Sequence, residues 1–164
     1  MVRDFTTKRL HVRPWAPDLR GPEAREAATE LLGPILTEEV LAPLPPSLAL
    51  HGGDVAGWVL ARLAESQLFL ISDLEEKALG LLIVAGPFEE ARDTLHIGYL
   101  LGRDHWGKGY ATELLRGLVA AIDGGTRLIA GVASDNPASA AVLRKVGFVE
   151  TGETADLLTF AYPG

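Results

Sequence analysis

The sequence predicts an α/β (α+β) fold, in which a mixed sheet carries helices on both faces. Strand-like and helix-like patterns alternate along the chain in the order β α α β β β α β α β β. The chain has 164 residues and no cysteine, a length at which one domain buries about two thirds of its unfolded surface without disulfides. No segment repeats or has low complexity, so we expect a single domain over residues 1–164.

The first half of the chain predicts one strand, two helices and a long loop. Residues 9–15 (RLHVRPW) alternate apolar and polar side chains, and the prolines at 14 and 17 end the strand. Residues 18–32 carry apolar side chains at the spacing of one helix face. Residues 33–54 predict a short helix at best and then a Pro- and Gly-rich loop, which either shapes a pocket or merely connects. Asp54 is a suitable N-cap for a helix with Val55, Trp58 and Val59 on one face.

The second half predicts six strands and two helices. Residues 67–73 and 78–88 flank the polar turn LEEK and predict an antiparallel hairpin. Residues 94–101 (TLHIGYLL) predict the next strand. Residues 108–122 repeat apolar side chains at helical spacing up to the stop DGGT. The remaining elements follow in order: a strand at 127–133, a helix at 137–146 and closing strands at 148–152 and 156–164.

Charge and composition limit the classes of partner. Fifteen Lys and Arg stand against 22 Asp and Glu, a formal net charge of -7, which opposes attraction to nucleic acid or to an anionic membrane surface. The absence of cysteine fits a reducing cytoplasm. The four histidines show no metal-ligand spacing, so no metal is expected. The N-terminus lacks the apolar core of a signal peptide, and no apolar run approaches the ~20 residues of a membrane helix. We therefore expect a cytoplasmic protein.

Residues 102–115 (GRDHWGKGYATELL) place glycines at 102, 107 and 109, where a predicted strand ends and a helix begins. A helix N-terminus offers unpaired N–H groups and roughly +0.5 of an elementary charge. Glycines there remove the side chains that would block a pyrophosphate. The stretch therefore predicts phosphate binding on the N–H groups from Gly107 to Ala111, without a metal ion.

Two other phosphate motifs match this stretch less well. Residues 102–108 satisfy the GxxxxGK of a P-loop, but Gly109 stands where a Ser or Thr hydroxyl would hold magnesium. The motif also comes too late in the chain for the sheet of such a domain. A dinucleotide fingerprint needs glycine at Thr112, and Asp135, the acid that closes the next strand, lies later than the usual ~20 residues.

Four segments of the chain, in this order and spacing, resemble one family. They are TTKRLHVRPW (6–15), ALGLLIV (78–84), HIGYLLGRDHWGKGYATELL (96–115) and ASDNPASAAVLRKVGF (133–148). The family is the Gcn5-related N-acetyltransferases (GNAT), in the branch of bacterial ribosomal-protein N-terminal acetyltransferases. Its Q/RxxGxG/A motif is met at Gly107 and Gly109, with Asp104 at the first position, a departure that leaves the amide cradle intact. The resemblance implies a single-domain GNAT-type, V-splayed mixed sheet of about six or seven strands.

The resemblance also implies a co-substrate, acetyl-CoA, and no metal. Its pantetheine arm would pair with the strand at 96–101, and an N–H of Leu100 or Leu101 would donate to the thioester carbonyl as it becomes an oxyanion, a contribution on the order of 3 kcal/mol. Trp106 would flank the phosphate loop, and Lys108 would face phosphate or solvent. The expected cofactor-binding residues are Leu100, Leu101, Trp106, Gly107, Lys108, Gly109, Tyr110, Ala111, Asn136 and Ser139.

Direct transfer to an amine needs a base that deprotonates the ammonium. His96 stands where many relatives have Glu, and an imidazole can take a proton at neutral pH. Glu89 and Glu90 are alternative bases or simply a solvated pair. Tyr99 is interpreted as a wall of the core or pocket. We therefore predict His96 as the catalytic base.

The departing thiolate needs an acid. Many relatives have a Tyr seven residues after the Asn of the second central motif, but this chain has Leu143 there. The branch that it resembles has a Ser three residues after that Asn, which here gives Asn136 and Ser139. We predict that Ser139 protonates the thiolate directly or through water. Asn136 binds pantetheine or that water and also serves as a helix N-cap before Pro137.

The sequence thus predicts an acetyl-CoA-dependent N-acetyltransferase that acts by direct attack of a primary amine, a protein N-terminal amine included. The alternative is a noncatalytic acyl-CoA-binding or regulatory module, favoured by the loss of both the usual Glu and the usual Tyr. The partner is an amine-bearing acceptor, a small molecule or a protein N-terminus. Its identity depends on Ala16–Ala64 and the hairpin loops, where patterns are weakest. Both monomer and homodimer fit the sequence.

Overall fold

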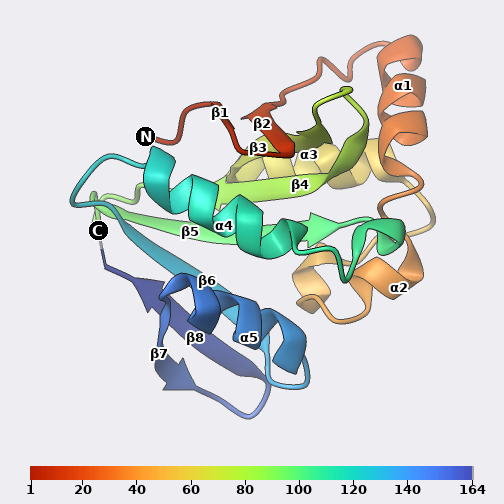
Figure 1. The fold of residues 1–164 in the computed structure, drawn as a ribbon. Coiled ribbons are helices and arrows are strands. Elements are labelled where there is room, and N and C mark those ends of the chain that lie inside the picture. Colours follow the sequence, from red (N-terminus) through yellow and green to blue (C-terminus); the bar gives the residue numbers. More distant parts are fainter. Residues whose placement is uncertain (164) are drawn as a thin grey trace.

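A mixed sheet of eight strands runs through the protein in the order β1-β2-β3-β4-β5-β6-β8-β7 (Figure 1). The computed structural model describes residues 1–163. The strands are β1 (Phe5–Thr6), β2 (Leu10–Pro14), β3 (Gln67–Asp73), β4 (Ala78–Ala85), β5 (Thr94–Leu101), β6 (Arg127–Ala133), β7 (Val149–Glu153) and β8 (Leu157–Tyr162). The helices are α1 (Pro22–Leu32), α2 (Glu38–Leu41), α3 (Val55–Glu65), α4 (Tyr110–Ala121) and α5 (Pro137–Val146), with 3-10 turns η1 (Pro46–Leu48) and η2 (Arg103–His105).

The predicted elements are all present, one strand is added, and several elements begin or end one to four residues from their predicted bounds. The sheet has one more strand than expected, because the two-residue β1 pairs with β2, with Phe5 opposite Val12. Helix α1 begins at Pro22, since a proline fits the first turn of a helix and Gly21 precedes it in an extended conformation. The closing strand ends at Tyr162, and the Gly164 end of its predicted range lies outside the described residues.

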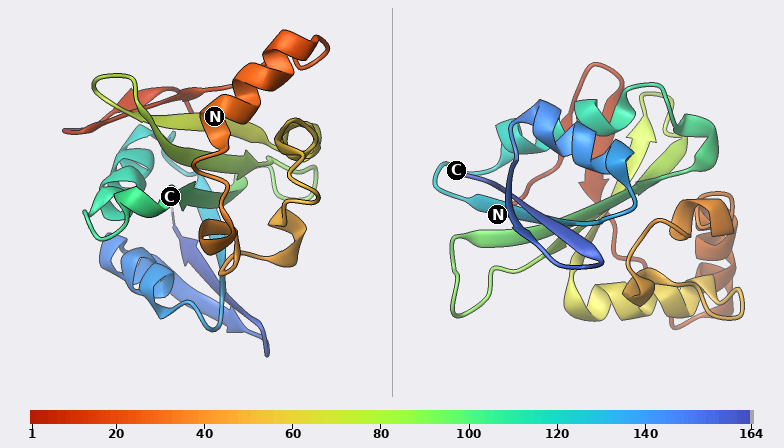
Figure 2. Two further views of the ribbon diagram at one scale, coloured as in Figure 1. Left: turned by 90° about the vertical axis from the view of Figure 1, so that its right-hand side faces the viewer. Right: turned by 90° about the horizontal axis from the view of Figure 1, so that it is seen from below.

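The helices cover the sheet in two layers, and each layer has its own core (Figure 2). Helices α4 and α5 pack on one face through residues that include Leu114, Leu118 and Leu143, none of which is exposed. Helices α1, α2 and α3 pack on the other face, over β3 and β4. Burial of each such leucine contributes about 1.5–3 kcal/mol. None of the helices within residues 1–163 is both long and apolar enough to cross a membrane.

The sheet opens into a V beside β5. This strand pairs with β4 along its length, antiparallel, from Ala85 opposite His96 to Gly80 opposite Leu101. Its parallel pairing with β6 spans only Thr94 to Ile97, and no β6 partner follows for residues 98–101 within the described chain. The second half of β5 therefore has one edge free of its neighbour, which confirms the predicted splay (Figure 1).

Gly80 lets β4 approach β5 closely next to this free edge. A Cβ added to Gly80 would clash with the carbonyl oxygen of Leu100 and would lie 3.0 Å from the Leu101 Cα. Any side chain at position 80 would therefore push the second half of β5 toward the opening. The absence of a side chain at this position fixes where the edge of β5 lies.

Candidate functional site

The loop before α4 forms a row of backbone donors that the described part of the chain leaves unpaired. Gly107 and Gly109 have φ angles of 70° and 78°, values that glycine adopts without a steric cost. Gly109 is also the N-cap of α4, and no side chain caps this helix. Within residues 1–163, the N–H groups of residues 107 to 112 donate to no backbone or side-chain acceptor. Consecutive N–H groups of this kind form an anion-binding concavity.

A cavity of about 510 Å³ adjoins this row of donors. It is walled by the end of β5, the loop, the first turn of α4 and the start of α5. Val40 of α2 closes it together with Pro43 and Leu44 of the loop that follows α2. The predicted site residues that line it are Leu100, Leu101, Trp106, Gly107, Gly109, Tyr110, Ala111, Asn136 and Ser139. Lys108 and His96 do not line it. The Pro-rich segment of residues 33–54 thus shapes a pocket and does more than connect helices.

The direction of the β5 donors follows from its pairing with β4. Gly102 donates its N–H to the Leu79 carbonyl at 2.8 Å, and Leu81 stands opposite Leu100. Since N–H groups alternate between the two sides of a strand, the Leu100 N–H points at β4 and the Leu101 N–H points into the opening. We therefore correct the expected free donor at Leu100, whose N–H is directed at β4. Leu100 itself still lines the cavity.

Trp106 fastens the loop to the end of β5. Its indole Nε1 donates to the Leu101 carbonyl at 2.9 Å. The guanidinium of Arg103 lies 4.8 Å from the centroid of the indole and pairs with Glu39 at 3.1 Å. These contacts of Trp106 hold the phosphate loop beside the opening.

Asn136 and Ser139 form a small polar cluster at the start of α5. The Ser139 N–H donates to Asn136 Oδ1 at 3.3 Å, and Asn136 Nδ2 donates to Ser139 Oγ at 3.2 Å. Because the backbone N–H of Ser139 can only donate, the Asn136 side chain must turn its Oδ1 toward that N–H and its Nδ2 toward Ser139 Oγ. The proton of the Ser139 hydroxyl is then not used in either hydrogen bond. Asn136 is thus the N-cap of α5, as predicted.

Tyr99 extends this cluster across the opening. Its hydroxyl is buried and has no hydrogen-bond partner of ordinary geometry among residues 1–163. Burial raises the pKa of Tyr99, and the neighbouring Ser139 hydroxyl offsets that rise only in part. The phenol is therefore protonated at neutral pH and available as a donor. Sequence reasoning assigned Tyr99 to a wall only, because periodicity does not show what a buried hydroxyl faces.

His96 lies on the other face of β5, away from Tyr99. It is exposed, and its ring meets the Phe88 ring edge-on with 5.5 Å between centroids. The next residue on that face is Gly98, and nothing lies within 4 Å of the position that a Cβ would take there. The structure does not bring His96 together with Ser139 in the cavity. Glu89 and Glu90 are exposed in the β4–β5 loop and also stand outside it.

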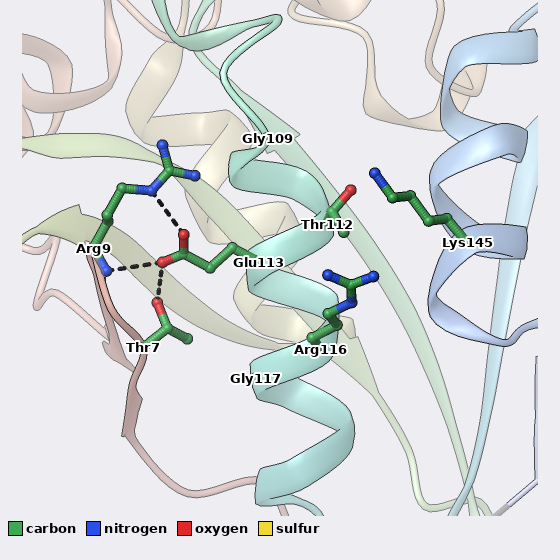
Figure 3. A pocket seen from close by; sticks show the side chains of 8 residues that line it. All are labelled: Thr7, Arg9, Gly109, Thr112, Glu113, Arg116, Gly117 and Lys145. Atoms are coloured by element: carbon green, nitrogen blue, oxygen red, sulfur yellow. Dashed lines mark hydrogen bonds and ion pairs between the residues drawn. The ribbon is translucent and has the colours of Figure 1, made fainter.

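A second cavity of about 510 Å³ lies along the outer side of α4 (Figure 3). It shares Gly109 and Thr112 with the first cavity, so the two meet at the N-terminus of the helix. Arg116 and Lys145 give it positive charge from α4 and α5. Sequence reasoning missed both residues, because the contact between these two helices is not visible in either pattern alone.

Glu113 joins α4 to the segment between β1 and β2 on the opposite side of this second cavity (Figure 3). It accepts from the Thr7 hydroxyl, from the Arg9 N–H at 2.8 Å and from Arg9 Nε at 2.7 Å. Burial raises the pKa of the Glu113 carboxyl, but the hydrogen bonds from Thr7 and Arg9 together outweigh it and lower that pKa. Glu113 is therefore ionised at neutral pH. Sequence reasoning missed this network too.

The donor set fits a diphosphate well. The unused N–H groups lie at a helix N-terminus, where the backbone itself carries positive charge. The side of Gly107 on which a side chain would stand is open, since nothing beyond its chain neighbours lies within 4 Å of a Cβ built there. A cavity continues from the donors on each side, toward the V-shaped opening and toward Arg116. A long ligand with a diphosphate near its middle matches this shape.

Comparisons with known proteins agree on one family. The family model described as "Acetyltransferase (GNAT) domain" matches residues 9–149. The fold is similar to a GNAT-family acetyltransferase from Bacillus anthracis, with 19% identity, 98% of both chains covered and a TM-score of 0.72. It is also similar to the ribosomal-protein-S5-alanine acetyltransferase from Vibrio fischeri, with 19% identity, 98% of this chain and 96% of that chain covered and a TM-score of 0.70.

A third similar structure contains a ligand of the expected kind. It is a ribosomal L7/L12 alpha-N-protein acetyltransferase in complex with coenzyme A, with 17% identity, 98% of both chains covered and a TM-score of 0.66. A comparison with the curated proteins gives no match. At these identities the structural likeness shows the fold, and the family model shows the family.

The Glu113 network predicts a pH-dependent contribution to stability. Folding lowers the pKa of Glu113 below its ordinary value of 4.5, so its contribution is complete above that value and is lost as the pH falls through the lowered pKa. We expect Glu113→Gln to lower the free energy of unfolding by about 1 kcal/mol at neutral pH, because Arg9 is partly exposed. Urea unfolding of both proteins from pH 7 to pH 3 measures the difference. A difference that grows toward low pH would contradict this account.

Proposed function

The chain belongs to the GNAT family of acetyltransferases, which use acetyl-CoA, and we propose that it transfers the acetyl group directly to a primary amine. The observation that supports this most is the row of unused N–H groups at residues 107 to 112, placed beside the free edge of β5. When bound, acetyl-CoA supplies an acetyl thioester that is activated toward attack by an amine. The residues of the chain then bind, orient and move protons.

The cavity supports direct transfer because it reaches both faces of the sheet. Tyr99 belongs to the core under α4 and α5, whereas Leu100 packs with α1, α2 and α3, and both line the cavity. A ligand held in the opening is thus approachable from the far face. We propose that the Leu101 N–H, which points into the opening, supplies the donor to the carbonyl under attack. Holding both reactants together in this geometry supplies much of the acceleration.

We propose Ser139 as the acid. Its Oγ already accepts from Asn136, and the buried Tyr99 hydroxyl is its neighbour on the other side. If Tyr99 donates to the second lone pair of Ser139, the serine proton has no acceptor within the cluster and is left to a group in the cavity. The raised pKa of Tyr99 keeps the phenol protonated for this purpose. A departing thiolate in the opening would take that proton.

His96 remains the proposed base, acting from the acceptor face. Its exposure and the open space over Gly98 allow an ammonium group to approach it. Its position outside the cofactor cavity suits a residue that serves the acceptor. The acceptor class is a primary amine. Two of the similar proteins are named as acetyltransferases of ribosomal proteins S5 and L7/L12, which supports a protein N-terminal amine within that class.

The second cavity extends the proposed cofactor site. It begins at Gly109, where the diphosphate would lie, and runs to Arg116 and Lys145. We propose that these two side chains take the 3′-phosphate at the nucleotide end of the ligand, since cations that face a phosphate form charge-assisted hydrogen bonds.

Thiol release tests the proposed function. The protein is incubated with acetyl-CoA and a panel of amines: a peptide, the same peptide with a blocked N-terminus, lysine and spermidine. Because the chain has no cysteine, a thiol reagent detects only released CoA. We expect release with at least one free amine and none with the blocked peptide unless it carries a lysine. Binding of CoA without release on any amine would favour the noncatalytic acyl-CoA-binding module, and failure to bind millimolar CoA would refute the cofactor claim.

Variants of the proposed acid and base test the proton transfers. We expect Ser139→Ala to lower kcat about 100-fold, and His96→Ala to lower kcat/KM for the amine by a similar factor and to flatten the pH profile near neutrality. His11→Ala serves as the control, because His11 lies on β2 outside both cavities. A larger loss in Tyr99→Phe than in Ser139→Ala would move the acid to Tyr99. Unchanged turnover in His96→Ala would remove His96 from the role of base.

Ligands with and without the 3′-phosphate test the second cavity. We expect Arg116→Ala and Lys145→Ala each to weaken CoA binding about 10-fold, a typical loss for one charge-assisted contact. Their binding of dephospho-CoA should match that of the unaltered protein. Isothermal titration measures both ligands, and Arg92→Ala, an exposed arginine outside both cavities, is the control. Equal losses for the two ligands would place the 3′-phosphate elsewhere.

A further inference from the structure

Arg9 contacts the phosphate loop from behind. Its Nη1 donates to the Lys108 carbonyl at 2.9 Å, and its Nε donates to Glu113 at 2.7 Å. Its guanidinium also lies 4.3 Å from the centroid of the Tyr110 ring. A single side chain from the residue before β2 therefore touches the loop and two residues of the first turn of α4, Tyr110 and Glu113.

The bond to the Lys108 carbonyl determines the direction of one donor in the row. The peptide that joins Lys108 to Gly109 is trans, since Gly86-Pro87 is the cis bond of the described chain. In a planar trans peptide the carbonyl and the following N–H point in opposite directions. Because Arg9 holds the Lys108 carbonyl, the Gly109 N–H points away from Arg9. Gly109 lines both cavities, whereas Arg9 lines only the second, so the side of Gly109 away from Arg9 is that of the first cavity.

This peptide has little else to hold it. Gly107 and Gly109 lie on either side of Lys108, both with positive φ, and glycine has the widest freedom of rotation of all residues. Among residues 1–163 the N–H groups of this stretch have no acceptor, so no hydrogen bond from them fixes the plane. The contact from Arg9 to the Lys108 carbonyl is the hydrogen bond that does so.

We propose that Arg9 is a positioning residue for the diphosphate of acetyl-CoA, which it serves by fixing the Lys108–Gly109 peptide with the Gly109 N–H aimed at the ligand. The proposal rests on the proposed function. The positive charge of Arg9 is already paired with Glu113, so orientation is its contribution. A guanidinium can donate to Glu113 and to the Lys108 carbonyl at the same time from one rigid plane, whereas an ammonium is a point charge on a flexible stem.

Two variants of Arg9 and two acyl donors test the proposal. S-acetylpantetheine carries the same thioester as acetyl-CoA but no diphosphate. We expect Arg9→Met to weaken CoA binding roughly 10- to 100-fold by isothermal titration, a typical range for the loss of a hydrogen bond from a charged group. The value of kcat/KM should fall by the same factor with acetyl-CoA and stay nearly constant with S-acetylpantetheine. Arg9→Lys should behave like Arg9→Met, because it keeps the charge and loses the planar fork.

Arg13→Met is the matched control. Arg13 lies four residues further along, on β2, and also pairs with a glutamate, Glu76, at 3.1 Å, but it does not line either cavity. If Arg9→Met fails to fold, Arg9→Lys carries the test. Equal losses with both acyl donors, unchanged CoA binding, or full rescue by lysine would each overturn the proposal. If the unaltered protein neither binds CoA nor releases thiol, the proposed function fails and the inference fails with it. If instead the unaltered protein binds CoA and releases thiol, and the Arg9 variants do so equally well, only the inference about Arg9 fails.

Discussion

The unpaired N–H groups at the start of α4 are the feature on which the rest of the site depends. A helix always leaves its first N–H groups without partners, and proteins commonly satisfy them with a side-chain cap. Here Gly109 is the N-cap, no side chain of the described residues caps the helix, and a second glycine, Gly107, lies in the loop before it. Leu114, Leu115 and Leu118 anchor the helix in the core, so the donors are held in place although no acceptor among residues 1–163 pairs with them. An anionic ligand completes this arrangement.

The remaining parts of the site place chemistry next to those donors. The short pairing between β5 and β6 leaves an opening at Gly98–Leu101, and Trp106 fastens the phosphate loop to its edge. Gly80 keeps β4 close to the same edge. The polar cluster of Asn136 and Ser139 stands at the start of α5, which packs against α4. The same few contacts therefore position both the residues that would bind the diphosphate end of a ligand and those that would act on its reacting end.

The sequence predicts local features of this site well and long-range ones poorly. The strand at 94–101, the glycines of the loop, the helix that follows and the Asn136 cap are written in periodicity and residue type over short stretches. Contacts between distant segments leave no such pattern. Arg9 and Glu113 are separated by 104 residues, so the sequence around one residue does not indicate that it contacts the other. Which N–H groups of β5 face β4 is known only from the register of the two strands. That His96 lies outside the cavity is known only from the twist and splay of the whole sheet.

The central claim is that main-chain N–H groups bind the diphosphate without a metal ion, and amide chemical shifts measure it most directly. A ¹⁵N-labelled sample is titrated with CoA in the presence of a chelator, and the resonances of residues 107 to 112 are followed. The account predicts that these amides shift strongly and saturably, with Gly109 among them, and that added magnesium changes nothing. If CoA binds while these resonances stay in place, or if they move only when magnesium is present, the claim is wrong.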